Sequence, residues 1–288
     1  MHLMMILTAI TVAWSLRHSG NHLQGNWNLR WRRSLFLFLF PPLLIFMTAI
    51  AVLFMGPQGK MGGINTEWWS YELALILLGF FAILCITLAF QGYQSVESAR
   101  KSPLVDIHGK QIRLLNTDAP FAGQIGFWHP ELVVSQGLLQ TLSPAHLNSV
   151  LAHEQGHYHY RDTFWFFWLG WVRASTSWLP NTNALWEELL ALRELRADSY
   201  AASQVDPLLL AESLLMVVSK NSVSSISSAI CCAALGASGG DAYGGKLRLE
   251  QRIEALLAPP EPTPEIKSHS WNNFLLAFLP LLTVIFHT

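Results

Sequence analysis

Two long apolar runs constrain this chain of 288 residues more than any other feature. Residues 34–56 and 71–90 each supply the roughly 20 mainly apolar residues that a helix needs to cross a bilayer. Residues 3–16 and 271–287 are shorter apolar candidates. The chain is 51% hydrophobic but only 13% charged, whereas soluble domains carry about 25% charged residues. We therefore expect a mainly α integral membrane protein with about four transmembrane helices.

These spans predict an N-terminal membrane domain at 1–99 with three helices, a domain at 100–270 outside the bilayer, and a C-terminal helix at 271–288. Basic residues favour one side of this arrangement. Arg17, Arg30, Arg32 and Arg33 separate the first two spans, Lys60 lies beside Glu67 between the next two, and Arg100, Lys101, Lys110 and Arg113 follow the third. Cytoplasmic loops are enriched in Lys and Arg. We expect a multi-pass plasma-membrane protein whose N-terminus is outside and whose 100–270 domain is cytoplasmic.

Charge and cysteine content exclude other classes of protein. The net charge is −1, which argues against direct binding of nucleic acid by this chain. The three cysteines are Cys85, Cys231 and Cys232. They form no disulfide framework and are compatible with a reduced cytoplasmic domain. The first apolar segment lacks a basic region before it, so we expect it to remain uncleaved.

A small β-sheet is expected directly after the third span. Residues 105–114 alternate in polarity around a glycine, which predicts a hairpin. Residues 123–135 then read as a strand interrupted by Pro130, and proline restricts a strand to a sheet edge or to its own end. Two interpretations stay open: a plain edge strand, or an edge that pairs with an extended substrate.

Several helices are predicted in the rest of this region. Ser143 and Pro144 are typical of a helix start, and that helix should run to about Arg161. Residues 163–180 are rich in tryptophan, which favours the membrane interface; we expect an interfacial or re-entrant segment there, with a fifth span as the alternative. Further segments complete the region: helices at 183–203, 211–220 and 247–257, a flexible Ser/Ala/Gly-rich loop at 222–245, and a stiff proline-rich linker at 259–264.

The sequence His153-Glu154-Gln155-Gly156-His157 lies on the helix that Ser143 opens. Residues i and i+4 share one helical face, so both imidazoles can bind one metal ion. This arrangement of two histidines with a glutamate is typical of zinc peptidases. We expect His153 and His157 to bind one Zn²⁺ and Glu154 to act as the general base.

A catalytic zinc ion takes three protein ligands and keeps its fourth position for water. Position 160 is Tyr and position 163 is Thr, so the Gly-x-x-His continuation of the three-histidine metzincin motif is missing. We expect Glu194 to be the third ligand, because Asp198 lies four residues later and can accept a hydrogen bond from a ligand histidine, most simply His153. Glu187 and Glu188 are alternative third ligands, although both are more simply interpreted as solvated charges.

This ligand set predicts a zinc metalloendopeptidase of the gluzincin type, in which Glu154 moves a proton between the attacking water and the leaving amine. The oxyanion-stabilising residue stays open among Tyr158, Arg193 and Tyr200. The remaining histidines of this region are read as ordinary surface or boundary residues: His108, His129, His146 and His159.

The order of these motifs resembles the membrane zinc metallopeptidases of the BlaR/MecR antirepressor family. The matching stretches are Gly126 with Pro130, Leu151–His157, Arg161-Asp162, Trp178-Leu179-Pro180-Asn181 and Arg193–Asp198. The resemblance covers about residues 1–287 and is specific from about 105 to 260. It implies a cytoplasmic gluzincin domain and regulated cleavage of a protein substrate, such as a winged-helix transcriptional repressor.

One feature of that family is absent from these 288 residues. The antibiotic sensors carry an extracellular penicillin-binding domain after the last span, whereas this sequence stops at Thr288. We therefore expect a separate sensor protein, a lipid signal or the outer loop at 57–70 to act as the trigger. Two other readings remain: a quality-control or processing protease of the HtpX or CAAX type, and a non-catalytic membrane scaffold, against which the intact Glu154 argues.

Overall fold

The computed structural model describes residues 2–19, 26–57, 60–61, 64–65, 68–107, 109–221, 242–258 and 272–286. The predictions for most of the 222–245 loop and the 259–264 linker, and those for Cys231, Cys232 and His108, concern residues outside these ranges. The chain divides into two compact units. The first comprises 1–86, 172–190 and 261–288, and the second comprises 87–171 and 191–260.

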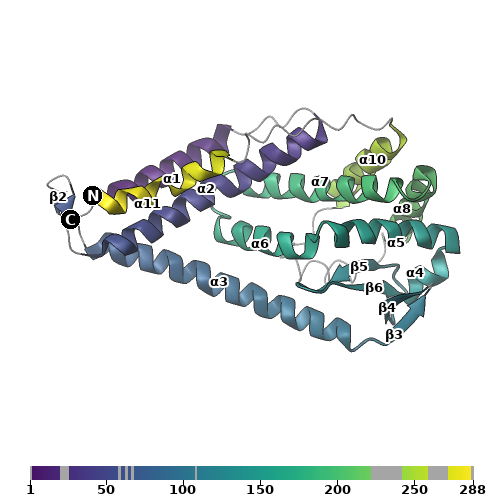
Figure 1. The fold of residues 1–288 in the computed structure, drawn as a ribbon. Helices are drawn as coiled ribbons and strands as arrows, with labels where there is room; N and C mark the ends of the chain where they lie inside the picture. Colours follow the sequence, from purple (N-terminus) through teal and green to yellow (C-terminus); the bar gives the residue numbers. More distant parts are fainter. Residues whose placement is uncertain are drawn as a thin grey trace. The chain divides into compact units, whose positions relative to one another are not determined.

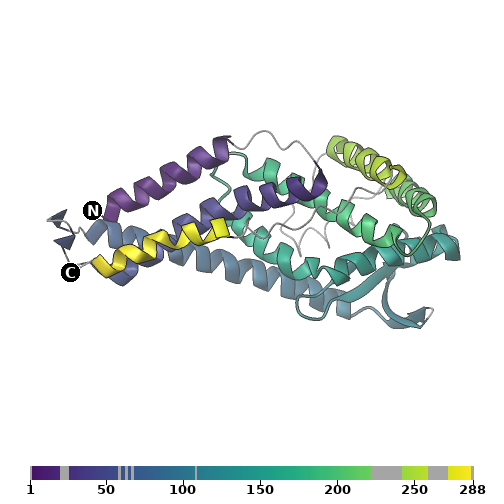
Figure 2. The same cartoon turned by 45° about the horizontal axis from the view of Figure 1, so that its top comes forward.

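The first unit is built from long apolar helices. Helices α1 (His2–Ser19) and α2 (Trp27–Met55) are followed by the short paired strands β1 (Lys60–Met61) and β2 (Ile64–Asn65) and by the start of α3 (Trp68–Arg100). The C-terminal stretch comprises η2 (Asn272–Phe278), α11 (Leu279–Leu282) and η3 (Thr283–Phe286). Helices α1 and α11 both lie along α2, as Figures 1 and 2 show.

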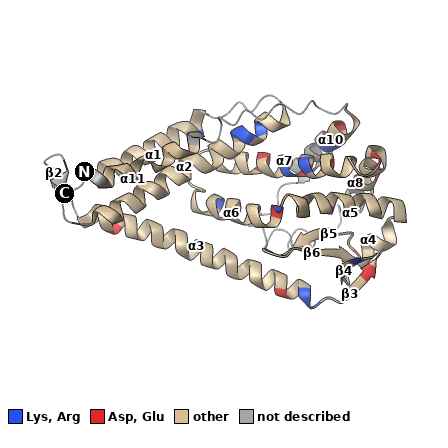
Figure 3. Cartoon of the chain, in the orientation of Figure 1, with Lys and Arg blue, Asp and Glu red and all other residues tan. Residues whose placement is uncertain are grey.

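Among the described residues, α2 and α3 are long and apolar enough to cross a membrane. Residues 34–55 of α2 and 73–96 of α3 contain no charged side chain, and Figure 3 shows charges only toward the ends of α3. By length and composition, these two helices are the segments suited to membrane association. Helix α1 and the 272–286 stretch do not pass the same test, so the predicted four spans and their orientation stay predictions.

The second unit contains a four-stranded sheet in the order β3-β4-β6-β5. Strands β3 (Leu104–Ile107) and β4 (Lys110–Leu115) form the predicted antiparallel hairpin, which confirms that expectation. Strand β6 (Glu131–Ser135) pairs in parallel with β4 and antiparallel with β5 (Ala122–Ile125). The small β-sheet expected after the third apolar run is therefore present.

The prediction of a single strand at 123–135 was wrong. The segment forms two strands joined by a loop at 126–130; β6 lies inside the sheet, and β5 forms one of its two edges. Pro130 ends the loop directly before β6, where its missing N–H costs no ladder hydrogen bond. Gly126 has φ of +128°, and a Cβ there would lie 2.8 Å from the carbonyl oxygen of His129. The chain can therefore reverse at this glycine.

Helices follow the sheet in the chain. They are α4 (Gln136–Thr141), α5 (Pro144–His159), α6 (Asp162–Ser175), α7 (Thr182–Ala202), α8 (Pro207–Asn221) and α10 (Ala242–Leu257). Helices α4 and α5 contact the strands of the sheet, and α5 and α7 carry the candidate site. The N-terminus of α5 is capped as predicted, because the Ser143 side chain accepts a hydrogen bond from the backbone N–H of His146 and Pro144 occupies the first turn. One face of α5 packs into a core formed with β4, β6 and α4, including Ile112, Val134, Leu138, Val150 and Leu151.

Candidate metal centre

The two histidines of the motif lie one turn apart on α5, with their Nε2 atoms 3.1 Å from each other. His153 is buried, and His157 is partly buried. The apolar positions Val150 and Leu151 fix the rotation of α5 by packing against the sheet. This packing leaves the histidine pair on the side of α5 that meets α7.

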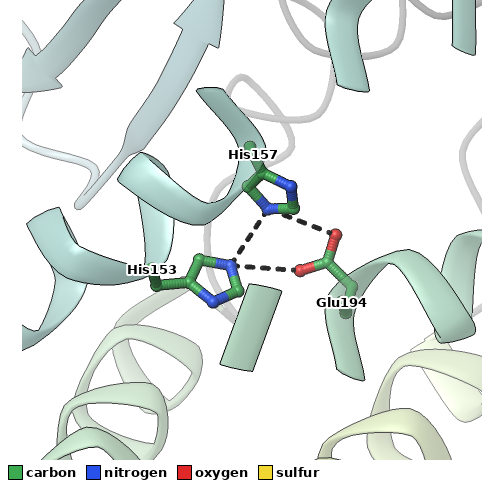
Figure 4. Close-up of side chains that lie close together, drawn as sticks. All are labelled: His153, His157 and Glu194. Atoms are coloured by element: carbon green, nitrogen blue, oxygen red, sulfur yellow. Dashed lines mark hydrogen bonds and ion pairs between the residues drawn. The ribbon is translucent and has the colours of Figure 1, made fainter. Parts of the chain in front are cut away.

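Helix α7 supplies the third group of the site. Oε2 of Glu194 lies 3.4 Å from Nε2 of His153, and Oε1 lies 3.7 Å from Nε2 of His157, as Figure 4 shows. Zinc–ligand bonds of about 2.0–2.1 Å in tetrahedral geometry separate the ligand atoms by about 3.4 Å. The three side chains therefore fit one zinc ion. They are also the one cluster of His, Cys, Asp and Glu suited to a metal ion within the described ranges.

The close approach of α5 and α7 depends on small residues. A Cβ on Gly156 would lie 3.1 Å from both Cα and the carbonyl oxygen of Ala197, which is itself fully buried. Gly156 lies within the histidine motif and Ala197 lies between Glu194 and Asp198. These two residues thus set the distance across which the histidines face the glutamate.

The Nδ1–H group of each histidine also donates a hydrogen bond to the carboxylate of a buried aspartate. Nδ1 of His153 lies 2.8 Å from Oδ1 of Asp198, and Nδ1 of His157 lies 2.7 Å from Oδ2 of Asp162. A carboxylate at Nδ1 fixes the ring orientation and leaves the Nε2 lone pair for a metal. The predicted partnership of Asp198 with His153 has the expected geometry.

Asp162 was not predicted as a partner of the site. It is the first residue of α6, and the chain reaches it through Arg161, which adopts a positive φ of 53°. This turn brings the first carboxylate of α6 back to His157, five residues earlier. The only sequence signal was the Arg161-Asp162 pair following the motif.

Three arginines surround these carboxylates. Arg196 forms an ion pair with Asp162, Arg193 lies 2.8 Å from Oε1 of Glu194, and Arg252 of α10 contacts both Asp198 and Glu194. None of the three was predicted in this role; Arg193 was considered only as an oxyanion donor. A buried carboxylate is costly unless it is paired and hydrogen-bonded, and these arginines provide that pairing.

The ion pairs shift the pKa values of the site in the metal-free protein. Burial alone would raise the pKa of Glu194, but Arg193, His157, His153 and Arg252 outweigh it and hold this pKa well below its usual value. Burial acts to lower the pKa of His153, but the charge and hydrogen bond of Asp198 and the hydrogen bond of Glu194 raise it to about 9. A metal ion at this site must therefore displace a proton from His153 near neutral pH.

Glu154 is buried beside His153 on α5. Its backbone carbonyl oxygen accepts a hydrogen bond of 3.3 Å from the Gln124 side chain of edge strand β5. The motif is thus attached directly to the sheet edge. The catalytic role of Glu154 stays a prediction.

The other residues considered from the sequence lie elsewhere or have other partners. Glu188 forms a two-point ion pair with Arg30 in the first unit. Tyr158 lines a cavity of about 370 Å³ with Phe127 and Trp128, and Tyr200 stacks on His159. The His146 ring forms hydrogen bonds with the side chains of Ser143 and Glu212. The oxyanion-stabilising residue stays unassigned.

Comparison with known families adds an independent observation. Residues 97–211 match the family described as Peptidase family M48. This segment is similar to M48 peptidase domains. The match covers about 40% of the chain and includes α5 and α7, and thereby His153, His157, Glu194 and Asp198.

M48 peptidases are metallopeptidases, typically of zinc, and include membrane proteases of BlaR and HtpX type. The match agrees with the metal-binding geometry of the three side chains. It does not distinguish the BlaR/MecR subtype from the HtpX type. A search of curated proteins found no relative.

Proposed function

We propose that this chain is a membrane-associated, zinc-dependent endopeptidase that hydrolyses peptide bonds of protein substrates. One observation carries the proposal: three buried or half-buried side chains from two helices bring one ligand atom each within 4.8 Å of one another, next to Glu154 and inside the segment that matches the M48 family. His153, His157 and Glu194 would hold the zinc ion. When bound, zinc supplies Lewis acidity that activates water and polarises the scissile carbonyl.

The protein's own residues would supply proton transfer and orientation. Glu154 takes the proton from the attacking water and returns it to the leaving amine. Asp198 and Asp162 hold His153 and His157 in the tautomer that leaves Nε2 free to bind the metal. A non-catalytic zinc scaffold would need neither the base nor its position beside a sheet edge.

Edge strand β5 is suited to hold an extended substrate. One side of β5 pairs with β6, while its other side has no strand partner among the described residues. Gln124 connects this edge to the backbone of Glu154. An extended peptide that adds to β5 would form main-chain hydrogen bonds close to the general base.

A cluster of aromatic rings supports a position at the membrane surface. Phe127 and Trp128 of the β5–β6 loop contact Phe164 and Phe167 of α6 at ring distances of 4.9–5.3 Å. Trp128 and Trp165 are more than half exposed. Exposed tryptophans are typical of the bilayer interface. We propose that this aromatic cluster meets lipid headgroups and that the protein is a multi-pass plasma-membrane protein with a cytoplasmic protease domain.

Two substrate classes remain, each with its own support. The motif order that resembles the BlaR/MecR family favours regulated cleavage of a transcriptional repressor, which we propose first. The M48 match is equally consistent with an HtpX-like protease that removes damaged membrane proteins. The regulatory and the quality-control protease differ in the proteins that they cleave.

The deciding experiment compares new protein N-termini in host cells that carry the wild type or Glu154→Gln. Cleavage of a DNA-binding repressor only in the wild type supports the regulatory role. Cleavage of many unrelated membrane proteins supports quality control. Identical N-termini in both strains, under conditions in which both proteins accumulate and bind zinc, would contradict an endopeptidase role in those cells.

A further inference from the structure

Arg252 belongs to the metal centre although it lies outside the M48 match. The match ends at residue 211, whereas Arg252 is carried by α10, which spans Ala242–Leu257. Its guanidinium nevertheless reaches α7. Nε lies 2.6 Å from Oδ2 of Asp198, and Nη2 lies 2.8 Å from Oδ1 of the same carboxylate. This is a two-point contact between a planar guanidinium and a planar carboxylate.

The contact fixes the orientation of Asp198 and through it that of His153. Oδ1 of Asp198 accepts from both Arg252 and Nδ1 of His153, while Oδ2 accepts a second hydrogen bond from Arg252. Asp198 is only 2% exposed, so these protein donors, and not bulk solvent, satisfy its carboxylate. If Arg252 were lost, the carboxylate could rotate, and the imidazole that depends on it could rotate as well.

The third nitrogen of the guanidinium acts on a second ligand. Nη1 of Arg252 lies 3.2 Å from Oε2 of Glu194, the same oxygen that faces His153. Arg252 therefore contacts Glu194 directly, and it reaches His153 through Asp198, with its own Nη2 at 3.5 Å from Nδ1 of His153. His157 has a comparable arrangement, because Arg196 pairs with Asp162, which in turn accepts from His157.

We propose that Arg252 is a positioning residue of the metal site, so that α10 completes a site whose ligands all come from α5 and α7. The proposal rests on the proposed zinc-binding function. Because all three guanidinium nitrogens already contact carboxylates, Arg252 acts through His153 and Glu194 and not on substrate. Lysine cannot reproduce the two-point contact, since its ammonium is a single point charge.

The test measures zinc binding by the full-length protein in detergent micelles, using competition with a chromophoric chelator. Loss of a hydrogen-bonding partner of a metal ligand lowers metal affinity about 10–100-fold, and we expect a loss of this size in Arg252→Gln. The zinc affinity of Arg252→Lys should lie between those of Arg252→Gln and the wild type, because lysine keeps the positive charge but cannot make the two-point contact with Asp198.

A second measurement distinguishes positioning of the metal ligands by Arg252 from a general stabilisation of the fold. With Co²⁺ in place of zinc, the visible absorption bands report the geometry of the bound ion. We expect these bands to shift in Arg252→Gln because His153 and Glu194 change orientation. A purely structural role of α10 would lower thermal stability but leave the Co²⁺ bands of the folded protein unchanged.

Arg30 provides a matched control. It makes the same two-point contact with Glu188, at 2.7 and 2.9 Å, and neither residue contacts the candidate ligands. Arg30→Gln and Arg30→Lys should leave zinc affinity and the Co²⁺ bands unchanged.

Wild-type affinity and unchanged Co²⁺ bands in Arg252→Gln would overturn the proposal, whether or not hydrolysis or stability falls. His153→Ala tests the underlying function separately. If the wild type binds no zinc, or His153→Ala binds it equally well, the proposed zinc site itself is contradicted.

Discussion

His153 and His157 each use one ring nitrogen for a buried aspartate and direct the other toward Glu194. Asp162 and Asp198 are in turn paired with Arg196 and Arg252. A ligand histidine held in this way has a defined tautomer and cannot rotate freely. These aspartates and arginines do not face the candidate metal position themselves. They hold the ligand side chains in place, so that the site is formed before a metal ion binds.

Asp162 is a sharp test of this arrangement. Asp162→Asn removes the charge that faces both His157 and Arg196 while nearly preserving the volume. We expect zinc affinity to fall about 10–100-fold, measured by chelator competition. Asp206→Asn is the control, because Asp206 is exposed and caps α8. Equal zinc affinity in Asp162→Asn and wild type would contradict the role assigned to Asp162.

The sequence allowed some of these residues to be predicted but not others. Glu194 and Asp198 could be proposed together because their spacing of four puts them on one face of a helix. Asp162 comes from the next helix and reaches His157 only through the positive φ of Arg161. Arg252 lies 54 residues from Asp198, and no periodicity relates them. Such contacts depend on tertiary packing.

At the scale of elements, the distance between α5 and α7 decides whether the ligands meet. Gly156→Ala would place a methyl group 3.1 Å from the backbone of Ala197. We expect the helices to separate slightly, with a loss of about 1–3 kcal/mol of stability and weaker zinc binding. Thermal unfolding and chelator competition measure the two effects.

Gly92→Ala is the control for that substitution. Gly92 lies in α3, and nothing lies within 4 Å of a Cβ added there. Alanine should be neutral or stabilising by up to about 1 kcal/mol, since glycine is the poorer helix former. If Gly156→Ala behaved like Gly92→Ala, the close approach of α5 and α7 would not be required.

The sheet offers a pH-dependent prediction away from the metal. Glu131 of β6 pairs with Arg113 of β4 and with Arg100, whose Nε lies 2.9 Å away. Burial acts to raise the pKa of Glu131, but the hydrogen bonds and charges of both arginines outweigh it and lower this pKa. The stabilisation is therefore present above the unfolded pKa of about 4.3 and is lost as pH falls through the lowered folded value.

Glu131→Gln should accordingly be less stable than the wild type at pH 7, by on the order of 1 kcal/mol. The difference should shrink as the pH is lowered from about 5 to 3. Unfolding midpoints of both proteins in detergent across this range provide the measurement. A difference that stays constant with pH would show that the ionised carboxylate is not what stabilises the sheet.

The wrong prediction of one strand at residues 123–135 is also explained at the scale of elements. Alternating apolar residues in β5 and β6 look like one strand, and Pro130 was taken as an interruption. The reversal depends on Gly126, whose positive φ cannot be inferred from the residue type alone. The helix starts were easier to predict, because Ser143 and Pro144 act locally.

At the scale of the whole molecule, the central expectation is a protease domain held at a membrane. The aromatic cluster predicts that a nitroxide at Trp128→Cys, in protein reconstituted into liposomes and lacking the native cysteines, is more accessible to oxygen than to a water-soluble nickel complex. Gln204→Cys, at an exposed turn of the same unit, should show the reverse. Higher accessibility to nickel at position 128 would contradict lipid contact there.

The most direct measurement is hydrolysis of an unfolded protein by the purified full-length chain, with bound zinc determined on the same samples. The wild type should bind one zinc ion per chain and cut the substrate. Glu154→Gln should keep its zinc but lose about 10²–10⁴-fold in rate, while His153→Ala should lose both. Equal cleavage by wild type and Glu154→Gln, or a wild type that binds no zinc, would contradict the account.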